Sequence, residues 1–99
     1  MNGAVDSTAP GVVAPVVEQR APGVYTPAAM RDQVQGDVVV EASVELTGKV
    51  SRVRLRQALH PDLDKSALQA ALSYRFVPGT RDGSPARVMT PITIEFRLR

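Results

Sequence analysis

The sequence predicts a small α+β fold, a three-stranded antiparallel sheet with two helices packed on one of its faces. Two stretches of alternating apolar and polar residues, joined by a glycine-containing turn, indicate a β-hairpin over residues 38–57. Apolar residues that recur every third or fourth position indicate an amphipathic helix over residues 63–74. A final alternating stretch over residues 92–98 indicates the third strand.

The length and composition of the chain limit the kinds of site that it can hold. Its 99 residues suffice for one domain with a terminal extension. Because it has no cysteine, disulfides and thiolate metal sites are excluded. The net charge of +2 is too small to indicate binding to nucleic acid.

Residues 1–22 are predicted to be a proline-rich tail, the end of a linker, in front of a domain that spans residues 23–99. Prolines are frequent in the tail, among glycine, alanine and valine. Proline removes backbone donors and stiffens the chain toward an extended form. The valines of residues 12–17 leave open the alternative that part of the tail lies along the domain.

Two helices are predicted from capping residues and apolar patterns. The hydroxyl of Thr26 suits an N-cap, the proline after it suits the first helical position, and Gly36 is expected to end this short helix. Asp62 is the expected N-cap of the main helix, which runs from residue 63 to about residue 74.

The hairpin consists of strands over residues 38–46 and 50–57, with Gly48 in the turn. In the second strand Val53 and Leu55 point inward, and the arginines beside them point outward. Val50 is out of phase with this alternation, which predicts a bulge near Ser51.

The third strand is expected at the edge of the sheet. Pro91 at its start cannot donate to a ladder and therefore suits an edge strand. A right-handed crossover through the main helix places this strand beside the first, antiparallel to it, so that the sheet order is 2-1-3. The expected core residues are Val40, Val44, Val53, Leu55, Leu68, Leu72, Phe76, Ile92, Ile94 and Phe96.

Residues typical of catalytic and metal sites are few. His60 is the only histidine, and next to a proline in a predicted turn it favours an ordinary loop role over catalysis. Asp62 and Asp64 are explained by capping and by the helix dipole, whereas a hard cation would need more oxygen ligands. We expect neither catalytic nor metal-binding residues.

Three arginines, Arg52, Arg54 and Arg56, form a basic row on the outer face of the second strand. Charges on an edge strand commonly prevent unwanted pairing, and we favour this interpretation of the arginine row. A contact with membrane headgroups or peptidoglycan stays open. Nucleic acid is not expected as a partner, because no aromatic residue interleaves with the row for base stacking.

Five short signals follow one another between residue 25 and the C-terminus. They are Tyr25-Thr26-Pro27-Ala28, Gln35-Gly36-Asp37-Val38, Leu63-Asp64-Lys65-Ser66-Ala67, Tyr74-Arg75-Phe76-Val77-Pro78 and Asp82-Gly83-Ser84-Pro85. In this order the chain resembles the C-terminal periplasmic domain of TonB-family energy transducers. It departs from the usual pattern at Pro27, which comes one position later, and at Tyr74, where the family usually has tryptophan.

The resemblance implies a force-transmitting binding module, not an enzyme, without cofactors. Members are anchored in the inner membrane, cross the periplasm on a proline-rich linker and bind the N-terminal box peptide of outer-membrane receptors. They transmit work derived from the proton gradient through inner-membrane motor proteins, which contact N-terminal parts that this chain lacks. Since neither a membrane-spanning segment nor a signal peptide is visible, we expect a periplasmic fragment with an added start methionine.

The resemblance makes the last strand, residues 88–98, the expected peptide dock, because an open edge offers unpaired N–H and C=O groups. Its expected peptide-binding residues are Val88, Met89, Thr90, Ile92, Thr93, Ile94, Glu95, Phe96 and Arg97. A hypothesis of a different class stays open. In it the domain is a structural module of another envelope machine, such as a gliding-motility complex, and the same edge pairs with a second copy to form a homodimer.

Overall fold

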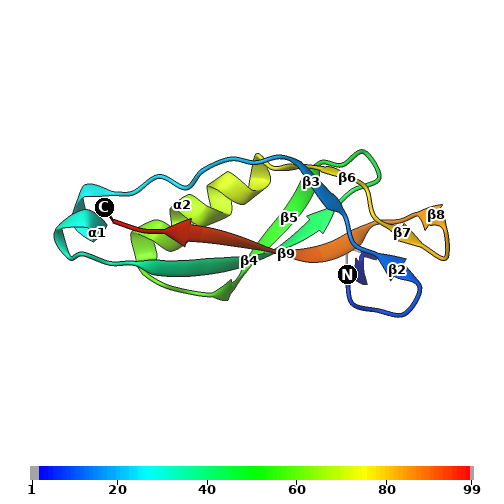
Figure 1. The fold of residues 1–99 in the computed structure, drawn as a ribbon, viewed down its shortest axis with the longest axis horizontal. Helices are drawn as coiled ribbons and strands as arrows, with labels where there is room; N and C mark the ends of the chain where they lie inside the picture. The colour runs from blue at the N-terminus through cyan, green and yellow to red at the C-terminus, as the bar shows by residue number, and fades with distance from the viewer. Residues whose placement is uncertain (1–2, 99) are drawn as a thin grey trace.

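The structure is a computed structural model that describes residues 3–98 of an elongated molecule, 48 × 21 × 21 Å (Figure 1). Short strands gather at one end, and α1 and the C-terminus lie at the other. The elements in chain order are β1 (Val5–Asp6), β2 (Val12–Val13), β3 (Val16–Gln19), α1 (Pro27–Arg31), β4 (Gly36–Val44), β5 (Val50–Gln57), α2 (Pro61–Leu72), β6 (Arg75–Val77), β7 (Thr80–Arg81), β8 (Ser84–Pro85) and β9 (Val88–Phe96).

The central sheet has the strand order β1-β9-β4-β5. The three predicted strands are neighbours in the predicted order, since β4 lies between β5 and β9 and is antiparallel to both. The prediction of only three strands is wrong, because β1 adds to the outer edge of β9 as a parallel fourth strand. Two smaller sheets, β2-β7-β8 and β3-β6, complete the fold.

The hairpin of β4 and β5 forms as the alternating pattern predicts. The register shifts between Ser43 and Val44, whose partners are Arg52 and Val50, so Ser51 lies in a bulge as predicted. The first and last strands are displaced from their predicted bounds. β4 begins and ends two residues before its predicted range, and β9 ends at Phe96, so that Leu98 lies beyond the strand and is half-buried.

The short helix α1 begins as predicted and ends earlier. Thr26 is its N-cap and accepts a hydrogen bond from the Ala29 N–H. The helix ends at Arg31, and Gln33, with φ 52°, takes the left-handed conformation that turns the chain. The prediction that Gly36 ends this helix is therefore wrong, because Gly36 is already the first residue of β4.

The main helix α2 has a different cap from the predicted one. Pro61 occupies the first turn and His60 is the N-cap, whose Nδ1 accepts from the Asp62 N–H at 3.2 Å. The prediction of Asp62 as the cap is wrong because Asp62 already lies within the first turn of the helix. Asp64 supports this end from inside the turn, and its Oδ1 accepts from the N–H groups of Leu59 and His60.

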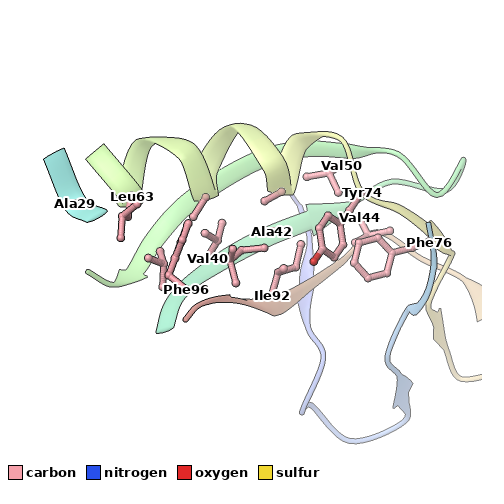
Figure 2. Packing of buried hydrophobic residues seen from close by; sticks show 14 residues of the cluster. Ala29, Val40, Ala42, Val44, Val50, Leu63, Tyr74, Phe76, Ile92 and Phe96 are labelled. Atoms are coloured by element: carbon pink, nitrogen blue, oxygen red, sulfur yellow. The ribbon is translucent and has the colours of Figure 1, made fainter. Parts of the chain in front are cut away.

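Both helices contribute to one core on a single face of the sheet. Figure 2 shows Ala29 of α1 and Leu63 of α2 beside side chains of β4 and β9. Most of the predicted core residues are buried, and Val53, Leu55 and Leu68 are half-buried against it. Leu72 is a wrong assignment. The buried face of α2 runs through Leu63, Ala67, Ala70 and Ala71, and Leu72 is 45% exposed.

The segment before residue 20 lies along the domain at three places. β1 pairs with β9, β2 pairs with β7, and β3 pairs with β6. The chain then continues past β9 and α2 toward α1 (Figure 1). This is the alternative that the valines of residues 12–17 left open, and the division of the chain at residue 22 stays a prediction.

Candidate peptide-binding site

The two faces of β9 differ in burial. Every second residue from Val88 to Phe96 is buried, while Pro91, Thr93 and Glu95 are exposed on the other face. This alternation follows from the two-residue period of a strand. The buried face and the ladder with β4 together hold β9 on the core.

The backbone directions of β9 follow from its pairing with β1. The N–H groups of Val5 and Ser7 donate to the C=O groups of Arg87 and Met89 at 3.0 and 2.9 Å. Odd-numbered residues therefore direct their backbone groups away from β4, and the alternation extends this direction to Thr93 and Glu95. Among residues 3–98, none pairs with Thr93 or Glu95 on this side.

Pro91 fits the same alternation. It stands opposite Glu41 of β4, at a position whose N–H would point outward, so its missing donor costs the ladder with β4 nothing. The prediction of an edge strand therefore holds at Pro91 but not at Val88 and Met89, where β1 pairs with the outer side of β9.

The start of the edge is occupied by β1, which pairs only with Val88 and Met89. A turn at Asp6 then leads the chain away. The Asp6 carboxylate accepts from the Thr8 N–H at 2.8 Å and from the Thr8 hydroxyl at 2.6 Å. These bonds hold the pKa of Asp6 below its usual value of 3.8, and the bond from the Thr8 hydroxyl has the largest effect.

A cleft of about 310 Å³ flanks the unpaired part of the edge. One wall is the segment of residues 20–23, which we call the strap. The other walls are Tyr74 and residues 93–95 of β9. The strap is held at its end by the Val24 N–H, which donates to Ser66 Oγ of α2 at 2.6 Å.

Gly23 brings the strap onto the buried face of β9. A Cβ at this position would lie 2.6 Å from Cζ of Phe96 and 3.0 Å from Cγ2 of Ile94. The first distance is shorter than real contacts of a Cβ, so any larger residue here would require Phe96 to shift. The strap is therefore tightly packed beside Phe96 and leaves the cleft open beside Thr93–Glu95.

The predicted site residues divide into three groups. Val88 and Met89 pair with β1, while Thr90 is a buried polar residue opposite Ala42 of β4. Residues 92–96 border the unpaired edge, and Arg97 follows the strand with its guanidinium paired to Asp37 at 3.1 Å. The sequence does not predict the strap or Tyr74 as part of the site, because a cleft wall formed by residues far apart in the chain has no local pattern.

Other parts of the described chain offer weaker candidates for a functional site. Within residues 3–98 no group of three or more His, Asp or Glu side chains is placed to hold a metal ion. The arginine row lies on β5, where Arg54 pairs with Glu41 at 3.2 Å. No helix in the described range is long and apolar enough to cross a bilayer.

The fold and its edge define an α+β domain with an accessible strand of the kind that extended peptides join. The chain belongs to the family described as Gram-negative bacterial TonB protein C-terminal, which it matches over residues 21–98.

Two curated relatives support this assignment. Both are Protein TonB of Xanthomonas campestris pv. campestris, from strains B100 and ATCC 33913, and each is 33% identical over 78 residues. The match covers 78% of this chain and 35% of each relative, so the chain spans about a third of their length.

A solved structure shares the fold. The solution NMR structure of the Pseudomonas aeruginosa TonB CTD superposes with a TM-score of 0.59 and covers 95% of both chains, at 17% sequence identity. At this identity the likeness concerns the fold alone.

Proposed function

We propose that this chain is the periplasmic peptide-binding domain of a TonB-like energy transducer. It docks an extended peptide from the N-terminal box of an outer-membrane receptor by strand addition at β9. The domain then passes force derived from the proton gradient to that receptor. Inner-membrane motor proteins act through parts of the protein outside this chain, and the domain itself catalyses no reaction.

One observation carries the proposal: among residues 3–98 none pairs with the outer edge of β9 at Thr93 and Glu95, while the buried face of the strand packs on the core. Strand addition needs such an edge, because backbone hydrogen bonds supply the affinity and side-chain contacts adjust the choice of peptide. Membership of the TonB C-terminal family supports the same function.

The affinity of the isolated domain should be modest. A flexible peptide loses conformational entropy when it is ordered along the edge, which offsets part of the gain from hydrogen bonding. We expect a dissociation constant of roughly micromolar order, as is usual when a disordered segment folds on binding.

The proposal is tested by isothermal titration calorimetry. A synthetic octapeptide with the sequence of a receptor's N-terminal box is titrated into the folded domain. Thr93→Pro removes an outward N–H and should abolish binding while the circular dichroism spectrum of the domain is retained. Thr93→Ala keeps the N–H and is the matched control, which should bind like the unsubstituted chain. Equal binding by the proline and alanine variants would refute strand addition at β9.

The same samples test self-association through this edge. Sedimentation of the unsubstituted chain without peptide should show a monomer. A dimer that the Thr93→Pro substitution dissociates would support the structural, self-associating module instead.

A further inference from the structure

Tyr74 of the cleft combines a deeply buried side chain with a hydroxyl that has no hydrogen-bond partner among residues 3–98 and stays accessible to solvent. Its side chain is 4% exposed and lines the cleft together with the strap and residues 93–95. Figure 2 shows its hydroxyl oxygen pointing toward β9. That hydroxyl makes no hydrogen bond to any residue in the described range 3–98, and no polar side-chain atom there is fully buried without a partner.

A buried tyrosine hydroxyl normally finds a partner, because an unpaired polar group removed from water is costly. The fold gives Tyr25 such a partner, the backbone C=O of Val34. The hydroxyl of Tyr74 instead faces the open cleft, where solvent or an incoming group can reach it. Its ring packs near Phe76, with centroids 6.1 Å apart, so the orientation of the side chain is set by the core.

The cleft lies where an added strand would place a side chain. In a strand paired with the outer edge of β9, the residue opposite Ile94 directs its side chain to the helix-facing side, as Ile94 does. On that side lie the strap and Tyr74. One side chain of the incoming peptide therefore enters the cleft.

The lining favours a particular chemistry for this side chain. Ala21, Pro22 and Ile94 offer apolar contact, and Tyr74 adds one hydroxyl. Arg20 and Glu95, which also line the cleft, carry opposite charges, so neither an acidic nor a basic side chain gains a clear electrostatic advantage. A short branched side chain with a hydroxyl matches both the apolar walls and the polar atom.

We propose that Tyr74 is a specificity-determining residue of the peptide site and that its hydroxyl hydrogen-bonds a threonine side chain of the incoming strand in the cleft beneath the strap. The threonine methyl packs on the apolar walls, and the two hydroxyls donate and accept with each other. This inference rests on the proposed strand addition at β9.

The test is a double-mutant cycle with the receptor-box octapeptide. Each peptide position is replaced in turn by threonine and by valine, which have the same shape and differ in the hydroxyl. At one position the unsubstituted domain should bind the threonine peptide about three- to tenfold more tightly than the valine peptide, the usual range for one net hydrogen bond. In Tyr74→Phe this preference should vanish, while the affinity for the valine peptide is kept.

The matched control is Tyr25→Phe, which removes a hydroxyl that the fold already satisfies. It should retain the full threonine preference. A preference at no position, or one that persists in Tyr74→Phe, overturns the role of Tyr74 while leaving strand addition intact. Failure of every peptide to bind the folded, unsubstituted domain refutes the proposed function, and the inference falls with it.

Discussion

At the scale of single residues, burial on α2 separates two leucines that the apolar pattern treats alike. Leu63 is fully buried, whereas Leu72 is 45% exposed. Leu63→Ala should lower the free energy of unfolding by about 2–5 kcal/mol through lost burial and the remaining cavity. Leu72→Ala should change it by less than about 0.5 kcal/mol, as for an ordinary surface substitution. Urea unfolding of both variants measures the difference, and equal losses would contradict the assigned face of α2.

Asp6 allows a pH prediction at the same scale. Its lowered pKa means that the turn at residues 6–8 contributes stability above the usual pKa of 3.8 and loses it as the pH falls through the lowered pKa. Thr8→Val removes the hydroxyl donor and keeps the backbone donor, so the pKa of Asp6 should rise toward 3.8 without reaching it. An NMR titration of the Asp6 carboxyl in both chains measures this, and identical pKa values would show that the hydroxyl bond has no effect.

At the scale of elements, β4, β5, α2 and β9 were predictable because each has a hydrophobic period over eight or more residues. The bulge at Ser51 was also visible, as a phase change at Val50. The strands β1 and β2 were not, since two residues are too few to establish a period. The cap of α2 was misassigned because both His60 and Asp62 have suitable acceptors, and only the position of Pro61 in the first turn distinguishes them.

The cleft could not be predicted for a related reason. Its walls come from the strap, from Tyr74 and from β9, which are far apart in sequence, and their meeting depends on tertiary packing. The open edge itself was predictable from Pro91 and the alternation after it.

The element β1 allows a prediction about the length of the dock. Ser7→Pro removes the N–H that donates to Met89, so β1 should leave the edge, whereas Ser7→Ala keeps this bond. When peptide binds the proline variant, the changes in amide chemical shift should extend along β9 as far as Met89. In the alanine variant they should not reach Met89. The same extent in both variants would show that β1 does not limit the edge.

At the scale of the whole molecule, two edges of the central sheet compete as docks. β5 forms one edge and presents the arginine row. At the other edge the short strand β1 covers only the start of β9, and the rest of β9 has no further neighbour among residues 3–98. Charges on an exposed strand oppose pairing with another chain, so we expect β5 to be the protected edge and β9 to be the one that accepts the peptide. The strap and its cleft also lie beside β9, which agrees with this division.

Amide hydrogen exchange tests strand addition at β9 most directly. Without peptide, the outward amides of Thr93 and Glu95 should exchange quickly, because no described residue pairs with them. Saturation with the receptor-box octapeptide should slow exchange at these two amides, while the amides of β5 are unchanged. Protection that appears along β5 instead, or binding that leaves Thr93 and Glu95 unprotected, would contradict the account.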